Sequence, residues 1–417
     1  MTAIEAQGIA AKSAATVLMT CSTKLKNDAL LNIANSLLEE KESILAANRL
    51  DVEVAKKSGM AESLIDRLSL DSKRIEAIAS SVMDVAAQND PIGRTEKLEK
   101  RPNGLLIGRK TVPLGVIAII YEARPNVTVD AAVLCIKAGN SVILRGGKEA
   151  FNSNNALTSL MRNAIKKAGL PEDAVSLIQN TQRSSVDELL NLTEYVDVLI
   201  PRGGAGLISH VVANSKIPVI ETGIGNCHVY VEESADLEMA ADIIFNAKCR
   251  RVSVCNAAES LIVDRSIASK FLPMAKKLLD SKQIELRGCD ETIMLLGNDI
   301  IPAADEDYYT EFLDYILAVK IVRDIDEAIA HIGKYGSKHS EAIITSSYKA
   351  VNKFLDEVDA AAVYVNASTA FTDGGEFGLG AEIGISTQKM HARGPMGLEQ
   401  LTSIKFVIYG DGQIRQP

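Results

Sequence analysis

The sequence contains no tryptophan and no excess of positive charge, since its formal net charge is −9 over 417 residues. Proteins that bind nucleic acids need cations to neutralise phosphates and aromatic rings to stack on bases. Both shortages argue against a nucleic-acid partner. We therefore expect a small molecule, or another protein, as the partner of this chain.

The sequence also lacks paired cysteines at metal-ligand spacing, and it has no long apolar run. Its six cysteines are too few for a disulfide framework in so long a chain, which predicts free thiols in the reducing cytoplasm. The apolar patch 14–19 is short and interrupted, and Glu5 precedes the first lysine, Lys12. We therefore predict no signal peptide, no membrane anchor and no bound metal.

A chain with 47% hydrophobic residues and this length predicts two lobes rather than one core. From residue 27 to 88, apolar residues recur at helical spacing, as in Leu30, Ile33 and Leu37. Residues 98–110 predict a β-hairpin, because Asn103-Gly104 is a favoured turn pair. The run 404–409 reads as a strand without a neighbour along the sequence. Both could pair across a subunit interface.

Between these segments, strand-like runs alternate with segments of helical length, which is typical of βαβ units and parallel sheets. The expected strands of the first lobe are residues 115–120, 141–145, 174–179, 196–200 and 217–221. Those of the second lobe are residues 260–263, 318–322, 342–345 and 361–365. The sequence thus predicts an α/β fold with two parallel sheets.

Glycine clusters follow two of these strands, but neither completes a standard nucleotide motif. Gly146, Gly147 and Lys148 lack the glycine that a P-loop has at position 142, and 223–228 lacks the third glycine of a dinucleotide fingerprint. Arg145 and Lys148 could still face a phosphate, although solvated loop cations are the alternative. Gly203 and Gly204 precede an expected helix, whose N-terminus can accept an anion.

Cys255 is the candidate nucleophile because several cations precede it, and cations stabilise a thiolate. These are Lys248, Arg250 and Arg251. Alternatively, Cys255 is an inert packing residue. Glu221 and Asn126 are also candidates for the site, but each has a non-functional alternative. Glu221 could be a solvated carboxylate at a strand end, and Asn126 could be a turn residue.

Several stretches together resemble the aldehyde dehydrogenase superfamily, and more closely its γ-glutamyl phosphate reductase branch. The most specific stretch is 322–343, VRDIDEAIAHIGKYGSKHSEAI, and it is supported by 121–130, 254–257 and 389–398. The resemblance implies an aldehyde-dehydrogenase-like fold with a cofactor domain (1–95 and 115–230), a catalytic domain (231–385) and an oligomerisation flap (96–114 and 386–417).

The resemblance also implies an activity, the NADPH-dependent reduction of L-glutamyl 5-phosphate to L-glutamate 5-semialdehyde in proline biosynthesis. Cys255 would be the nucleophile, and Asn126 would hold the oxyanion. The expected cofactor-binding residues are Arg145, Gly146, Lys148, Gly203, Gly204, Glu221 and Glu311. The expected anchors of the substrate carboxylate or phosphate are Arg124, Arg250, Arg251, His391 and Arg393.

Two other functions stay open on the sequence alone. A hydrolytic NAD(P) aldehyde dehydrogenase would use the same thiol with Glu221 activating water, and a catalytically silent assembly protein would use only the scaffold. The expected partners are the small-molecule substrate, further copies of the chain and possible association with the kinase that supplies the acyl phosphate.

Overall fold

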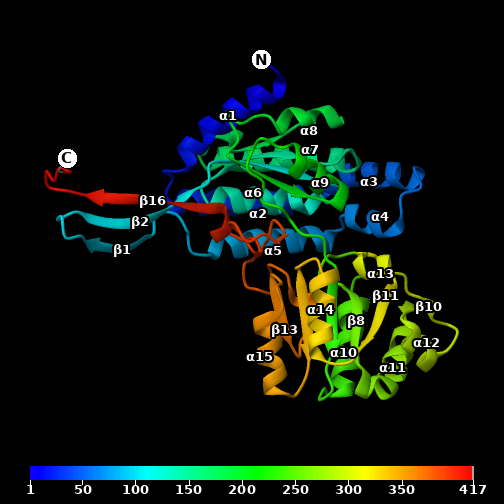
Figure 1. The fold of residues 1–417 in the computed structure, drawn as a ribbon. Coiled ribbons are helices and arrows are strands. Elements are labelled where there is room, and N and C mark those ends of the chain that lie inside the picture. The colour runs from blue at the N-terminus through cyan, green and yellow to red at the C-terminus, as the bar shows by residue number, and fades with distance from the viewer. Residues whose placement is uncertain (416–417) are drawn as a thin grey trace. The chain divides into compact units, whose positions relative to one another are not determined.

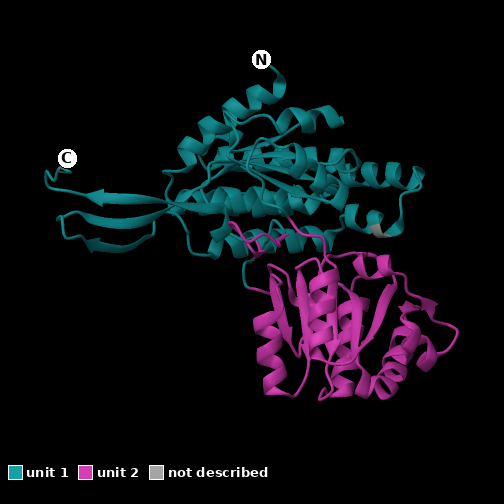
Figure 2. Ribbon diagram, in the orientation of Figure 1, with its two compact units in different colours: residues 1–221, 378–384, 396–417 teal, residues 222–377, 385–395 magenta. Residues whose placement is uncertain are grey.

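The structure is a computed structural model that describes residues 1–415, apart from the side chain of Ser63. The chain divides into two compact units (Figure 2). Unit 1 comprises residues 1–221, 378–384 and 396 onward, and unit 2 comprises residues 222–377 and 385–395. The change of unit after Glu221 comes earlier than the expected boundary at 230, because Cys227–Val231 is a strand of the second sheet.

Unit 1 begins with helices, as the periodicity of residues 27–88 predicts (Figure 1). Leu30, Ile33 and Leu37 are fully buried on one face of α2. The bounds are α1 Ala3–Leu18, α2 Thr23–Glu39, α3 Lys41–Lys57, α4 Glu62–Leu68 and α5 Ser72–Ala87.

The main sheet of unit 1, within the described residues, has four parallel strands in the order β5-β4-β3-β6. They are β3 Val116–Tyr121, β4 Ser141–Arg145, β5 Val175–Leu177 and β6 Val198–Arg202, as predicted. All six residues of β3 are buried, which is typical of a parallel strand covered on both faces. The helices between and after the strands are α6 Pro125–Lys137, α7 Phe151–Lys167, α8 Arg183–Leu189 and α9 Ala205–Asn214.

The fifth strand expected in this lobe, residues 217–221, does not form. Only Val219 makes an isolated parallel bridge, to Leu199. Pro218 has no N–H to extend the ladder before this bridge, and Pro201 of β6 has none to extend it afterwards, so the pairing stays a single bridge.

A separate antiparallel sheet, which we call the flap, consists of β1 Thr95–Lys100, β2 Leu106–Pro113 and β16 Thr402–Tyr409. The predicted hairpin forms, and its turn contains Gly104 at φ 87°. The tail strand, which has no neighbour along the sequence, finds a partner within its own chain. β16 pairs with β2 over its whole length, from Thr402 opposite Pro113 to Tyr409 opposite Leu106.

Unit 2 contains a seven-stranded parallel sheet, counted over the described residues, in the order β10-β9-β11-β8-β7-β12-β13. The strands are β7 Cys227–Val231, β8 Ala258–Asp264, β9 Glu285–Gly288, β10 Ile301–Pro302, β11 Ile316–Val322, β12 Ser340–Ile344 and β13 Ala362–Val365. The four strands predicted for this lobe are among them.

Helices cover both faces of this sheet. Val229 and Leu261 pack with α10 and α11, whereas Tyr230 and Ile262, the next residues along their strands, pack with α14 and α15. The helices are α10 Leu237–Cys249, α11 Arg265–Asp280, α12 Asp290–Leu296, α13 Asp305–Tyr309, α14 Ile325–Tyr335 and α15 Tyr348–Glu357. A small hairpin follows, of β14 Ile385–Ser386 and β15 Gly394–Pro395.

Among residues 1–415, no helix combines the length and the apolar character needed to cross a bilayer. The same residues contain no cluster of side chains suited to hold a metal ion.

Candidate active site

Cys255 lies in the loop that joins α10 to β8 in unit 2, and its side chain is half-buried. Cys135 and Cys227, in contrast, are fully buried, and burial raises the pKa of both thiols. Those two behave as packing residues, whereas Cys255 remains within reach of a reagent.

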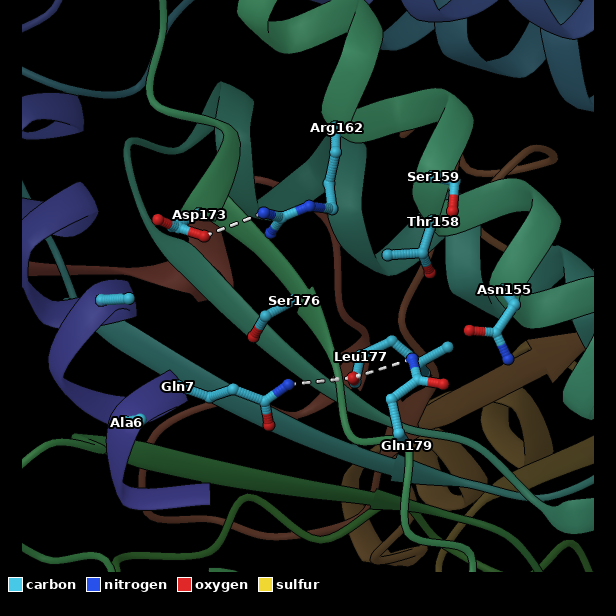
Figure 3. A pocket seen from close by; sticks show the side chains of 11 residues that line it. Ala6, Gln7, Asn155, Thr158, Ser159, Arg162, Asp173, Ser176, Leu177 and Gln179 are labelled. Atoms are coloured by element: carbon cyan, nitrogen blue, oxygen red, sulfur yellow. Dashed lines mark hydrogen bonds and ion pairs between the residues drawn. The ribbon is translucent and has the colours of Figure 1, made fainter. Parts of the chain in front are cut away.

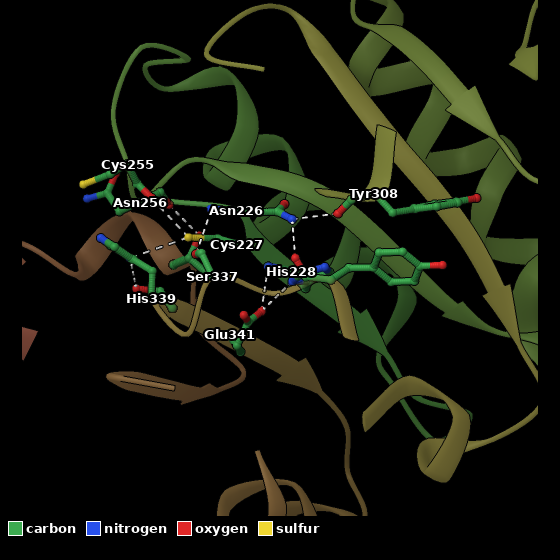
Figure 4. Close-up of polar contacts among 12 residues, drawn as sticks. Asn226, Cys227, His228, Cys255, Asn256, Tyr308, Ser337, His339 and Glu341 are labelled. Atoms are coloured by element: carbon green, nitrogen blue, oxygen red, sulfur yellow. Dashed lines mark hydrogen bonds and ion pairs between the residues drawn. The ribbon is translucent and has the colours of Figure 1, made fainter. Parts of the chain in front are cut away.

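The residues around Cys255 hold its loop through buried polar contacts (Figure 4). The Cys227 thiol donates to the Cys255 carbonyl oxygen at 3.2 Å. The Asn256 amide donates to the carbonyl oxygens of Ala370 (3.2 Å) and Thr372 (3.1 Å). The hydroxyl of Thr369 in turn donates to the Asn256 carbonyl oxygen at 2.7 Å. The loop is therefore a fixed platform.

The cations that precede Cys255 have different surroundings. Lys248 is fully buried, and its Nζ lies 2.5 Å from Glu259 Oε2. Burial raises the pKa of Glu259 to about 7, although Lys248 opposes this rise. Arg250 and Arg251 follow α10 at the surface, where both are exposed. Of the three cations that precede Cys255, the two arginines are therefore the ones that a dissolved anion can reach.

A groove of about 1070 Å³ in unit 1 contains the predicted phosphate-facing cations. Arg145 and Lys148 line it at the end of β4, together with Glu122 after β3 and Gly206 in α9. The chain runs from β3 to β4 on one side and later adds β6 on the other side of β3. Dinucleotides bind at such switch points, outside the carboxyl ends of parallel strands.

Two of the predicted glycines, Gly146 and Gly203, let side chains approach the backbone closely. A Cβ on Gly146 would collide with the Asn154 amide, and one on Gly203 would lie 2.7 Å from the Glu122 carboxyl carbon. Gly204, by contrast, has open space around it, and its N–H donates to Glu122 Oε2 at 3.1 Å. The sequence reading missed Glu122 because a lone carboxylate after a strand carries no pattern.

Arg145 is partly engaged by its own unit. Its guanidinium donates to the carbonyl oxygens of Thr181 (2.7 Å) and Gln182 (3.1 Å), just before α8. Burial lowers the pKa of this guanidinium. Lys148 is exposed, so it is the more accessible of the two cations.

Asn126 is half-buried in the first turn of α6, next to Arg124, which is the N-cap residue. Its amide donates to Asp130 Oδ2 at 3.0 Å. Glu221 is the last residue of unit 1 before the chain enters unit 2. These three predicted site residues therefore belong to unit 1, whereas Cys255 belongs to unit 2.

The remaining predicted site residues, Glu311, His391 and Arg393, lie in unit 2. Glu311 Oε1 accepts a hydrogen bond from the Gly225 N–H at 2.7 Å. Arg393, just before β15, pairs with Asp359 at 2.6 Å, and Lys389 pairs with the same carboxylate at 2.8 Å. These cations hold the pKa of Asp359 far below its usual range. His391 lies between them in sequence and is exposed.

A second groove of unit 1, about 420 Å³ in volume, contains none of the predicted site residues (Figure 3). Arg162 of α7 pairs there with Asp173 at 3.0 Å, and Gln7 donates to the Leu177 carbonyl oxygen at 3.0 Å. The buried hydroxyls of Thr158 and Ser176, which also line this groove, have no hydrogen-bond partner among the residues that the structure describes.

Comparison with known proteins identifies the family of this chain. The model of the aldehyde dehydrogenase family matches residues 2–294. The chain is 61% identical to the γ-glutamyl phosphate reductase of Carboxydothermus hydrogenoformans and 58% identical to that of Halothermothrix orenii, each over 97% of both chains. The solved structure of γ-glutamyl phosphate reductase from Thermotoga maritima superposes with a TM-score of 0.95, at 49% identity and over 100% of both chains.

More distant structures share the fold. An acetylating aldehyde dehydrogenase from Geobacillus thermoglucosidasius gives a TM-score of 0.75 at 19% identity, over 99% of this chain and 98% of the other. The family match covers more than half of the sequence, and the reductases named above match nearly all of it. The chain therefore belongs to the aldehyde dehydrogenase family.

Proposed function

We propose that this chain reduces L-glutamyl 5-phosphate to L-glutamate 5-semialdehyde and phosphate, with NADPH as the hydride donor. The observation that carries the proposal is the 56–61% identity, over nearly the full length, to proteins named γ-glutamyl phosphate reductase. The half-buried Cys255 on a fixed loop supplies the thiol that such a reaction needs.

The groove of unit 1 fits a dinucleotide carrying an additional phosphate. Gly204 and Gly206 leave open space at the start of α9, where backbone N–H groups can approach a phosphate. Arg145 and Lys148 supply positive charge near it, which favours NADP over NAD because the extra phosphate is close to a dianion. Bound NADPH would supply a hydride to the acyl carbon.

Cys255 acts first in the reaction that we propose. Its thiolate attacks the γ-acyl carbon, a C–S bond forms, and the Asn126 amide donates to the developing oxyanion. The C–O bond to phosphate then breaks, which leaves a thioester on Cys255. After reduction of the acyl carbon, the C–S bond breaks, the thiolate is restored and the aldehyde leaves.

Several cations are suited to hold the charged ends of this substrate. The exposed Arg250 and Arg251 precede Cys255 in the chain, and the half-buried Arg124 is the N-cap residue of α6, two positions before Asn126. Arg393 and His391 are further candidates for the substrate carboxylate, which a planar guanidinium can bind through two hydrogen bonds. Arg393 would have to share its guanidinium with Asp359.

The names of the relatives favour reduction of an acyl phosphate over the hydrolytic alternative. Water activated by Glu221 would hydrolyse the thioester and waste the substrate, so we assign Glu221 to the cofactor side of the site. Glu311 has the same proposed role, as a carboxylate for the nicotinamide ribose.

The flap is the surface through which we expect copies of the chain to associate. Phe406, Ile408 and Tyr409 of β16 are each more than half exposed, which is unusual for apolar side chains on one strand. The free cysteines are consistent with a cytoplasmic enzyme. Association with the kinase that makes the acyl phosphate would protect this labile substrate.

The reverse reaction tests the proposal most directly. Purified chain and glutamate 5-semialdehyde should reduce NADP only when inorganic phosphate is present, and NAD should be a poorer acceptor. Reduction of the cofactor without phosphate, with glutamate as product, would instead support the hydrolytic activity.

A further inference from the structure

The peptide of Cys255 rests directly on Gly225, the third residue after the chain enters unit 2. A Cβ built on Gly225 would overlap the carbonyl group of Cys255 and lie 2.5 Å from its Cα. No side chain fits between these two segments. Any displacement of Gly225 would therefore displace the residue that carries the thiol.

Hydrogen bonds fix Gly225 and also its neighbour Asn226, whose contacts with Tyr308 and Ser337 can be followed in Figure 4. Glu311 Oε1 accepts from the Gly225 N–H at 2.7 Å, and Ser337 Oγ accepts from the Asn226 N–H at 2.9 Å. The buried Asn226 amide donates to the carbonyl oxygens of Tyr308 (2.7 Å) and Tyr335 (2.9 Å). Residues 308–311 and residues 335–337 of unit 2 thus both hold Gly225 and Asn226 in place.

The next residues of this segment are fixed as well. Both the N–H and Nδ1 of His228 lie within 2.9 Å of Glu341 Oε2, and both side chains are fully buried. Cys227, between Asn226 and His228, donates to the Cys255 carbonyl oxygen. Three of the supporting residues, Tyr335, Ser337 and Glu341, belong to the stretch 322–343.

We infer that Glu311 and residues 335–341 of the stretch 322–343 position the nucleophile by holding the segment 225–228 on which Cys255 rests. These are positioning residues, because they act through Gly225 and Cys227 on the Cys255 backbone. The inference depends on the proposed role of Cys255 as nucleophile. It assigns a positioning role to residues 335–341, which had no role so far, and it gives Glu311 a second role in addition to cofactor binding.

Gly225→Ala tests the support directly, and Gly333→Ala is its matched control. The control lies in α14 of the same unit, where a new Cβ meets no atom within 4 Å. We expect Gly225→Ala to slow turnover about a hundredfold, the size expected for a misplacement near 1 Å, with little change in the dissociation constant of NADPH. Alkylation of Cys255 by iodoacetamide, followed on its peptide by mass spectrometry, should change as well. Control-like turnover and alkylation would overturn the inference.

Glu311 offers a second test that does not add volume. Glu311→Gln keeps an oxygen that can accept from the Gly225 N–H, whereas Glu311→Ala removes it. We expect the alkylation rate of Cys255, measured without cofactor, to change at least about threefold in Glu311→Ala and to return to the wild-type rate in Glu311→Gln. If Glu311 serves only the cofactor, both variants will alkylate like wild type and differ only in NADPH binding.

The same experiments separate this inference from the proposed function. The alkylation rates need neither substrate nor cofactor, so they report on the support of the thiol alone. Loss of the phosphate-dependent reaction in the wild-type chain would overturn the proposed function, whereas wild-type alkylation in both Gly225→Ala and Glu311→Ala would overturn only the positioning role.

Discussion

His331 should make the folded protein less stable in mild acid. Its imidazole is 7% exposed in α14, and its ring centroid lies 4.5 Å from that of Tyr335 and 5.0 Å from that of Tyr308. Burial, followed by the nearby groups His228, Lys320 and Lys334, lowers the pKa of His331 from 6.5 to about 3. Glu327 opposes this shift in part.

The sign follows from the two protonation states. Between pH 6.5 and 3 the unfolded chain binds a proton at His331 and the folded chain does not, so acid favours unfolding. Above pH 6.5 this effect of His331 is absent, and below pH 6.5 the free energy of unfolding decreases as the pH falls. At pH 5 this single residue should reduce the free energy of unfolding by about 2 kcal/mol relative to pH 8.

Urea unfolding, followed by circular dichroism between pH 5 and 8, measures this effect. His331→Phe keeps an aromatic ring in the cluster but cannot bind a proton. Between pH 8 and pH 5, the free energy of unfolding of the variant should therefore decrease by about 2 kcal/mol less than that of the wild type. Equal pH dependence for the variant and the wild type would refute the argument. It would mean that the imidazole is hydrated or paired in the folded protein.

Four further predictions concern the site. Cys255→Ser should abolish reduction and leave NADPH binding largely intact, and more than about a tenth of wild-type turnover would argue against a covalent route. Asn126→Ala should lower kcat about a hundredfold, since it removes one oxyanion donor, whereas a change in KM alone would make it a binding residue. Neutral residues at both Arg145 and Lys148 should weaken NADPH binding, measured by titration, far more than NADH binding, and equal losses would contradict their role. Arg393→Lys should raise the KM for glutamate 5-semialdehyde and spare that for NADP; unchanged KM values with lower thermal stability would leave Arg393 only its contact with Asp359.

The local patterns of the sequence were sufficient to predict the four strands of the parallel sheet in unit 1 and four of the seven in unit 2, whereas β7, β9 and β10 were missed. Strands such as β3 and β8 are short apolar runs between helical segments, and this alternation is encoded residue by residue. The hairpin was equally readable, because Asn103-Gly104 is itself a turn signal. Pro218 was the local warning that residues 217–221 would not complete a ladder.

The candidate site was readable from sequence only through family resemblance. The cations that precede Cys255 made it a candidate but could not separate a reactive thiol from a packing residue, because reactivity depends on exposure and surroundings. The same holds for Arg145 and Lys148, which composition alone cannot separate from solvated surface cations. A resemblance supplied those roles, whereas local periodicity supplied the strands.

Contacts between distant segments were decided only by the tertiary structure. The pairing of β16 with β2 joins residues about 300 positions apart, and no local signal specifies such a partner. The close approach of Gly225 to Cys255 likewise depends on how β7 and β8 lie side by side in one sheet. The sequence by itself determined which segments are strands and helices, because backbone preference and apolar spacing act over a few residues. Tertiary packing determined which of these segments contact each other. A strand edge can pair with many strands and a glycine can pack against many segments, so the partner is fixed only when the core is packed as a whole.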